Sequence, residues 1–105
     1  MNTYFKIGSN QRERNTQAIC HVAGEDVLSR VDFLYSYDTP VAFYCHQSGT
    51  VYTTHQKFST TTTRHLNKWL QRFSGFNEIK PVPQATIDQI HHRANLWEAQ
   101  QAGVL

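Results

Sequence analysis

Three cations recur at four-residue intervals in the segment Phe58–Phe73. Arg64, Lys68 and Arg72 are spaced so that their side chains share one face of a helix. Like charges at this spacing repel one another slightly, so the pattern is mildly unfavourable unless solvent or a polyanion faces it. Because phosphate contacts by Lys and Arg dominate sequence-independent binding of nucleic acid, the stripe is a candidate phosphate-binding surface. An ordinary solvated helix face is the alternative.

The start of the same helix is a second candidate site for an anion. Ser59 is a suitable N-cap, and the four threonines Thr60–Thr63 follow where Asp or Glu would normally offset the positive end of the helix dipole. Free amides and hydroxyls at such a position can bind phosphate, whereas local capping by the hydroxyls is the alternative. The predicted hydrogen-bonding neighbours of the basic stripe are Thr61, Thr62 and His65, and Lys57 adds a further cation.

Two cysteines and six histidines raise the question of a metal site. Cys20 and Cys45 each precede a histidine, but neighbours on a strand point to opposite faces, so neither pair can chelate one ion. The sequence contains no CxxC or HxxxH spacing, which leaves Cys20, Cys45 and His55 as a combination that only the fold could assemble. We expect no metal, no cofactor and two reduced, buried cysteines. Surface or stripe-edge positions are expected for His91 and His92.

The residue pattern does not indicate an enzyme. Catalysis needs a nucleophile beside a base, or paired carboxylates in a cleft, and the acids here are expected in loops or at outward positions. The sequence also contains no glycine-rich phosphate loop and no nucleophile elbow. The chemistry that the residues favour is binding.

Two helices are predicted to position these side chains. Leu66, Trp69, Leu70 and Phe73 recur at helical spacing, so one side of the first helix, residues 59–73, should be buried. Gly75 follows it as a helix terminator, and Pro81–Pro83 form an extended connector. The second helix is predicted over residues 84–102. Its apolar face comprises Ile87, Ile90, Ala94 and Trp97.

The strands are predicted mainly in the middle of the chain. Alternation over Val31–Tyr37 indicates a half-buried strand, and Val41–His46 and Val51–His55 should form a hairpin through Gln47–Gly49. The expected register sets Cys45 opposite Val51 and Phe43 opposite Thr53. The face formed by Val41, Phe43, Cys45 and Val51 should pack against the first helix, and the other face carries Tyr44 and Tyr52.

The first thirty residues have weaker patterns. Short strands are predicted at Thr3–Ile7 and Ala18–Val22, and one helical turn at Asp26–Arg30. Asn10–Gln17 contains no apolar residue and is therefore predicted to be a loop.

A chain of 105 residues is long enough for one core, so residues 1–105 are expected to form a single domain. The predicted fold class is α+β, with a small antiparallel sheet of about three to five strands packed against two C-terminal helices. Within it, residues 1–30 supply N-terminal strands and loops, 31–56 the hairpin core, and 59–73 and 84–102 the helices.

The net charge of +2 is distributed unevenly. Residues 57–80 hold five Lys and Arg against one Glu, so the positive excess lies on or beside the first helix. The polar N-terminus has no signal-peptide pattern, and no apolar run reaches the length of about twenty residues that a membrane span needs. We expect a cytoplasmic protein that does not contact membranes.

Two blocks of sequence, Ser36–Ala42 (SYDTPVA) and Ser59–Leu70 (STTTTRHLNKWL), resemble the signature of an uncharacterised domain family of small proteins in tailed bacteriophages and related mobile elements. The similarity covers residues 36–70, and no catalytic residues are assigned to that family. Its recurrent polar positions correspond here to Thr61, Thr62, Arg64, His65, Asn67 and Lys68. The resemblance implies a phage or plasmid setting, and with it the cytoplasm of a host cell, without implying a mechanism.

Two classes of binding protein fit these observations. The first is a non-enzymatic accessory protein that binds nucleic acid or another anionic partner through Arg64, Lys68 and Arg72. The second is a protein-binding inhibitor of a host defence complex, for example an anti-CRISPR protein, which would use an aromatic sheet face or the C-terminal helix. A strongly acidic DNA mimic does not fit the charge. A homodimer formed through the C-terminal helix is a further expectation, suggested by the Trp97 stripe.

Overall fold

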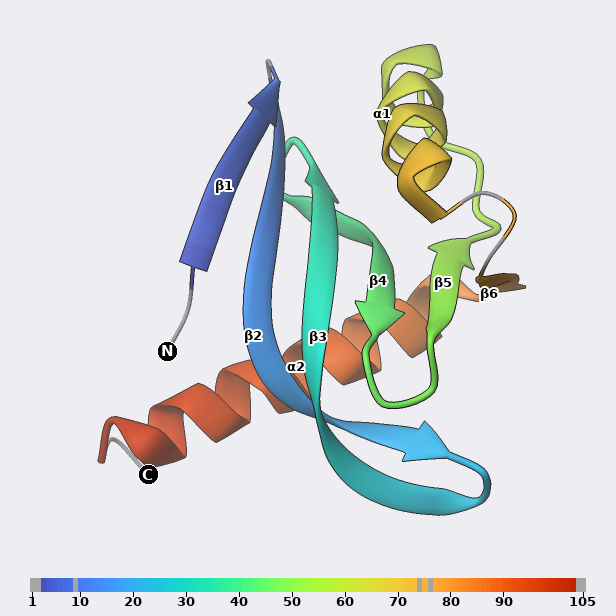
Figure 1. The fold of residues 1–105 in the computed structure, drawn as a ribbon. Coiled ribbons are helices and arrows are strands. Elements are labelled where there is room, and N and C mark those ends of the chain that lie inside the picture. The colour runs from blue at the N-terminus through green and yellow to red at the C-terminus, as the bar shows by residue number, and fades with distance from the viewer. Residues whose placement is uncertain (1–2, 9, 74, 76, 104–105) are drawn as a thin grey trace.

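The computed structural model describes residues 3–8, 10–73, 75 and 77–103. In chain order the elements are β1 (Thr3–Gly8), β2 (Gln11–Val22), β3 (Glu25–Ser36), β4 (Thr39–Cys45), β5 (Thr50–Thr54), α1 (Thr60–Leu70), a 3₁₀ turn η1 (Gln71–Phe73), β6 (Glu78–Val82) and α2 (Gln84–Gln101). The six strands form one sheet in sequence order, antiparallel except for the parallel pair β5–β6 (Figure 1). The predicted α+β class is confirmed, with slightly more strands than expected.

The two helices pack on opposite faces of this sheet (Figure 1). Neighbouring side chains on a strand point to opposite faces, and on β3 Phe33 packs in the α2 cluster whereas Leu34 packs with Trp69 of α1. The α1 cluster comprises Leu34, Val41, Ala42, Val51, Trp69 and Phe73. The larger α2 cluster comprises Ala18, Cys20, Val31, Phe33, Tyr35, Phe43, Cys45, Val82, Ile87, Ile90 and Ala94. Strand β3 is therefore buried on both faces from Val31 to Ser36.

The N-terminal predictions are wrong in two places. Residues 11–17, predicted within a loop, belong to the long strand β2, and the helical turn predicted at Asp26–Arg30 lies within β3. These strands pair over their whole length, from Gln11↔Ser36 to Val22↔Glu25. The turn between them has positive φ at Ala23 and Gly24, as tight hairpins require. A strand formed without apolar residues at its start has to satisfy its inward-facing polar groups by hydrogen bonds and ion pairs, which are described below.

The β4–β5 hairpin turns where predicted, but its register differs by one residue. Cys45 pairs with Thr50 and Phe43 with Tyr52, because Gly49, in the left-handed conformation, donates its amide to the Cys45 carbonyl at 2.9 Å. A one-residue shift sends every side chain of the return strand to the other face. The predicted single apolar face is thus divided, since Val51 packs toward α1 whereas Phe43 and Cys45 pack toward α2.

The remaining elements lie close to their predicted bounds. Ser59 caps α1 by accepting a hydrogen bond from the Thr62 amide at 3.2 Å, and Gly75 follows η1 with a φ of +86°. Pro81 and Val82 of the predicted connector belong to β6, an edge strand where Pro81 needs no outward amide donor, and Pro83 is the N-cap of α2. The predicted stripe of α2 lies on the sheet, with Ile87, Ile90 and Ala94 buried and Trp97 half-buried.

Candidate anion-binding surface on the first helix

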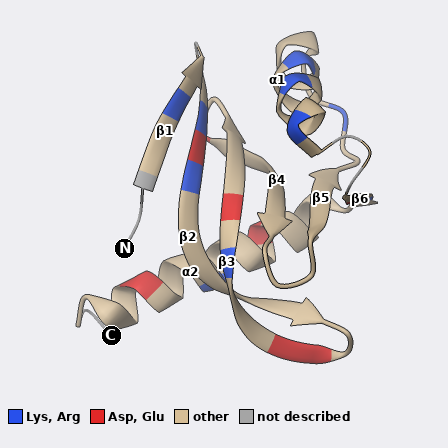
Figure 2. Ribbon diagram, in the orientation of Figure 1, with Lys and Arg blue, Asp and Glu red and all other residues tan. Residues whose placement is uncertain are grey.

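The sheet holds α1 by its apolar side and leaves cations on the solvent side. Trp69 and Phe73 are buried, whereas Arg64 and Lys68 are exposed, as is Lys57 in the segment before the helix. Neither the first turn nor the rest of α1 contains an acid, and Figure 2 shows basic positions without acidic ones along it. Within the described part of the chain, Arg64, Lys68 and Lys57 have no ion-pair partner.

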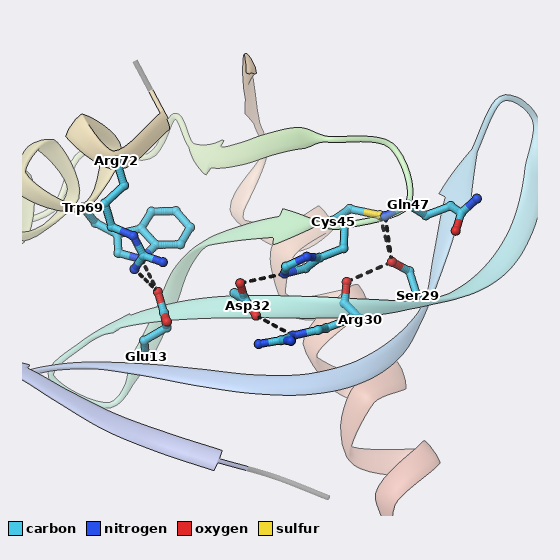
Figure 3. A network of polar contacts seen from close by, with 9 residues as sticks. Glu13, Ser29, Arg30, Asp32, Cys45, Gln47, Trp69 and Arg72 are labelled. Carbon is cyan, nitrogen blue, oxygen red and sulfur yellow. Dashed lines mark hydrogen bonds and ion pairs between the residues drawn. The ribbon is translucent and has the colours of Figure 1, made fainter. Parts of the chain in front are cut away.

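Arg72, the third cation of the predicted stripe, is engaged inside the fold. Its Nη1 forms an ion pair with Glu13 of β2, whose side chain is 8% exposed, and the same carboxylate accepts a hydrogen bond of 2.7 Å from Trp69 Nε1 (Figure 3). About half of the Arg72 side chain remains exposed, at 51%. Its charge is therefore balanced by Glu13, and Arg72 fixes the end of α1 to the sheet.

Two of the predicted hydrogen-bonding residues also serve the docking of α1. The Ser36 hydroxyl donates to Thr62 Oγ1 at 2.9 Å and lies 2.8 Å from His65 Nδ1. Gln11 donates to the carbonyl oxygen of His65 at 3.1 Å. Thr62 is buried and His65 half-buried, as is Thr61. The Thr62 and Thr63 amides bond to Ser59, so local capping occupies this end of the helix.

The structure thus separates the predicted site residues into two groups. Arg64, Lys68 and Lys57 face solvent, whereas Arg72, Thr62 and His65 connect α1 to the sheet. The residues that the sequence did not identify are Gln11, Glu13 and Ser36, which form hydrogen bonds to α1 from strands β2 and β3. All six residues 11–16 are polar, so this segment lacks the apolar alternation that normally identifies a strand.

The family model described as "family of unknown function (DUF8033)" matches residues 5–89 of the chain. The chain belongs to this family. The match runs from within β1 into the first turns of α2, so it includes the basic helix and all of the sheet except the first two residues of β1. No curated protein and no solved structure matches the chain. Among the described residues, no helix is long and apolar enough to span a membrane.

The sequence predicts that the acids of this DUF8033 chain lie in loops or at outward positions, and this prediction is wrong for two of them. Glu13 and Asp32 are both buried on strands, on the face of the sheet that carries α1. Asp32 Oδ2 lies 2.8 Å from His46 Nε2, and Asp32 Oδ1 lies 3.6 Å from Arg30 Nε (Figure 3). Each buried carboxylate therefore has a cation or an imidazole nitrogen within 4 Å, and Asp32 Oδ1 is buried without a hydrogen-bond donor among the described residues.

The other face of the sheet carries a second polar cluster, beneath the C-terminal half of α2. Arg14 is 2% exposed and donates to Tyr35 Oη at 3.3 Å, to Asn95 Oδ1 at 2.9 Å and to Glu98. Burial disfavours its charge, but the hydrogen bonds to Tyr35 and Glu98 outweigh burial and raise the pKa of Arg14. Tyr35 Oη lies 2.6 Å from His91 Nε2, and burial raises the pKa of Tyr35. His91 is thus a half-buried edge residue, whereas His92 is exposed.

The two cysteines are free and buried, as predicted, and they lie in the α2 cluster. The hydrogen bond to Cys45, together with burial, raises the pKa of Cys20, so Cys20 is a protonated thiol. Cys45 lies 3.5 Å from the Ser29 hydroxyl, which also accepts from the Gln47 amide at 3.1 Å (Figure 3). His55 is exposed, and no group of three potential metal ligands occurs among the described residues.

Proposed function

We propose that this DUF8033 protein is a non-enzymatic module that binds an anionic partner, with nucleic acid as the first candidate, through the solvent side of α1. The proposal is supported by one observation: α1 presents exposed cations, contains no acid, and is held to the sheet by its opposite side. Arg64 and Lys68 are the proposed phosphate contacts, and Lys57 extends the surface toward the helix start. A phage or plasmid setting, and hence action inside a host cell, belongs to this proposal as well.

The structure changes the proposed roles of the other predicted residues. Arg72 adds little net charge because Glu13 balances it, and Thr62 and His65 orient the helix through Ser36. We therefore assign these three residues to positioning the surface. Thr61, which is half-buried beside them, is a peripheral contact at most.

Fluorescence anisotropy with labelled DNA and RNA at low salt tests this proposal. Affinity should fall as salt rises, because each phosphate contact releases counterions. Lys68→Glu and Arg64→Glu should each weaken binding by about tenfold on every sequence alike, since phosphate contacts carry no sequence information. Lys80→Glu, which reverses an exposed charge on edge strand β6 beside residues of the α2 cluster, is the matched control. The proposal fails if wild type does not bind, or if Lys68→Glu behaves as Lys80→Glu does.

The alternative is a protein-binding inhibitor of a host defence complex, and its predicted surfaces are partly occupied. Tyr52 stacks on Phe43 with ring centroids 4.6 Å apart, Tyr44 packs on Phe73, and the apolar stripe of α2 lies on the sheet rather than being free for a second copy. Tyr4 and Phe5 on edge strand β1 are exposed, at 52% and 48%, and Tyr37 and Phe58 are exposed singly elsewhere. This edge is the surface that favours the alternative, because an unpaired strand is a template for a partner.

The two functions make different predictions for one assay. An inhibitor should block target cleavage by a purified CRISPR effector at stoichiometric concentration, and Phe5→Glu should abolish the block while Lys68→Glu leaves it intact. A nucleic-acid-binding module should reduce cleavage only at concentrations that coat the DNA, and added competitor DNA should relieve that effect.

A further inference from the structure

Two cations face each other where strands β1 and β2 meet at the hairpin end. Lys6 and Arg12 are directly opposite in the antiparallel register. Like charges at such positions are destabilising. Lys6 is exposed and has no ion-pair partner among the described residues, and Arg12 Nη1 contacts Asp38 Oδ1 at 3.1 Å. The Asp38 side chain is 93% exposed, so this ion pair is weak and can be displaced by a stronger anion.

A cavity of about 400 Å³ opens beside these two cations. Lys6, Arg12, Tyr4, Asn10 and Gln11 are among its lining residues, and none of the described lining residues is an acid. Lys6 and Tyr4 lie two residues apart on β1 and therefore share one face with Arg12. The cavity thus combines two cations with an aromatic ring.

Tyr4 provides a flat surface within reach of the cations. The guanidinium carbons of Arg12 and Arg14 each lie 5.6 Å from the centroid of its ring. Arg14 is committed to Glu98 and Asn95, so the available charge of the cavity comes from Lys6 and Arg12. Tyr4 itself is 52% exposed, which leaves part of its ring free to stack against a planar ligand.

We propose that this cavity binds the phosphate group of a nucleotide, with Lys6 and Arg12 holding the phosphate and Tyr4 stacking on the base. A guanidinium and an ammonium are the side-chain groups that bind phosphate oxygens most strongly, and an aromatic ring accepts any base. The nucleotide is either free or the phosphorylated 5′ end of a strand. The first case is independent of the function proposed for α1, whereas the second rests on it.

Calorimetric titration with adenosine monophosphate, adenosine and inorganic phosphate tests the free-nucleotide case. The monophosphate should bind at least tenfold more tightly than adenosine, and Lys6→Gln should weaken its binding by about tenfold. Arg12→Gln should have a similar effect, and Lys80→Gln, which removes an exposed lysine from the opposite edge of the sheet, should have none. Equal affinities for adenosine and its monophosphate would contradict phosphate recognition.

Lys6→Glu separates binding from folding. This change places an acid opposite Arg12 and should raise the melting temperature, because it replaces a repulsive cross-strand pair with an attractive one. The same variant should lose binding of the monophosphate. A folded Lys6→Glu protein that binds it as wild type does would overturn the proposed site.

Oligonucleotides with a 5′-phosphate or a 5′-hydroxyl distinguish the two sources of the phosphate. If a strand end is the ligand, wild type should prefer the phosphorylated strand, Lys6→Gln should lose that preference, and Lys68→Glu should lower affinity for both strands equally. Binding of the monophosphate with no binding of either strand would support this cavity and reject the function proposed for α1. The proposed site would be rejected if Lys6→Gln changed the affinity for neither the monophosphate nor the phosphorylated strand.

Discussion

Glu13 is the residue that joins the basic helix to the sheet. Its buried carboxylate accepts from the Trp69 ring N–H and pairs with Arg72, so one side chain satisfies two donors on α1 and η1. Hydrogen bonds to a charged group typically contribute about 1.5–3 kcal/mol, and a buried charge that loses its donors costs at least as much. Glu13 should therefore set the stability of α1 docking.

A double-mutant cycle between Glu13 and Trp69 tests this role. Glu13→Ala and Trp69→Phe should each lower the free energy of unfolding by about 1–3 kcal/mol, because each removes one partner of the buried hydrogen bond. The double variant should lose less than the sum, with a coupling of about 0.5–3 kcal/mol in urea titrations. Trp69→Ala should cost on the order of 3 kcal/mol or more, since it also leaves a cavity. Strict additivity of the first two changes would show that the Glu13–Trp69 contact contributes nothing.

The sequence predicted the cations of the candidate site but not their engagement. Helical spacing correctly indicated that Trp69 is buried while Arg64 and Lys68 face solvent. It also assigned Arg72 to the same stripe. The acid that neutralises Arg72 lies 59 residues away along the chain, and no local pattern predicts a contact at that separation.

At the scale of elements, strand β2 shows why the N-terminal prediction failed. Apolar alternation identifies a strand by the surface that it buries, but the start of β2 buries Gln11, Glu13 and Arg14 instead. Each of these side chains bonds to a helix that follows much later, Gln11 and Glu13 to the segment of α1 and η1, and Arg14 to α2. A strand of this kind is stable only when the whole fold is present, so its sequence resembles that of a loop. The bounds of both helices were predicted to within a few residues, because each helix packs on the sheet through its own apolar stripe.

The C-terminal half of α2 docks through a polar cluster, and this makes its docking sensitive to pH. Burial, and then the charge of Arg14, lower the pKa of His91. Arg14 can only donate and Tyr35 accepts from it, so the Tyr35 hydroxyl is left to donate to His91 Nε2. The folded protein therefore holds this imidazole neutral, with its proton on Nδ1.

The stability of the protein should consequently fall as pH decreases below about 7. The pKa of His91 is lower in the folded chain than the unfolded value of about 6.5, so the unfolded chain takes up the proton first and gains stability from it. The contribution of His91 to the free energy of unfolding is present above the unfolded pKa of about 6.5. It is lost on acidification, at no more than about 1.4 kcal/mol per pH unit.

Unfolding free energies of wild type and His91→Gln between pH 5 and 8 test this effect. Glutamine keeps an acceptor for Tyr35 but does not titrate, so the variant should show a shallower loss on acidification. His92→Gln, which changes the exposed neighbouring histidine, should follow wild type. Parallel curves for wild type and His91→Gln would mean that the imidazole is not held neutral by this cluster.

At the scale of the whole molecule, β3 lies between the two cores and, like β4, contributes side chains to both. It supplies Phe33 and Tyr35 to the α2 cluster and Leu34 to the α1 cluster, so neither core can open without exposing one side of this strand. We therefore expect the chain to unfold as one cooperative unit, as the prediction of a single domain requires. The two tryptophans make this testable, because Trp69 lies in α1 and Trp97 in α2, on opposite faces of the sheet.

Single-tryptophan variants should report the same transition from both sides. In Trp97→Phe the fluorescence comes from the α1 core, and in Trp69→Phe from the helix on the other face. For each variant, the urea midpoint measured by fluorescence should coincide with the midpoint from far-ultraviolet circular dichroism, because loss of either core exposes β3 and with it the centre of the sheet. The variants can differ from each other in stability, so the comparison is between two probes of one protein. A fluorescence change of Trp69 at lower urea than the loss of strand signal would show that α1 detaches first, and would make the cationic surface a mobile element rather than part of a rigid fold.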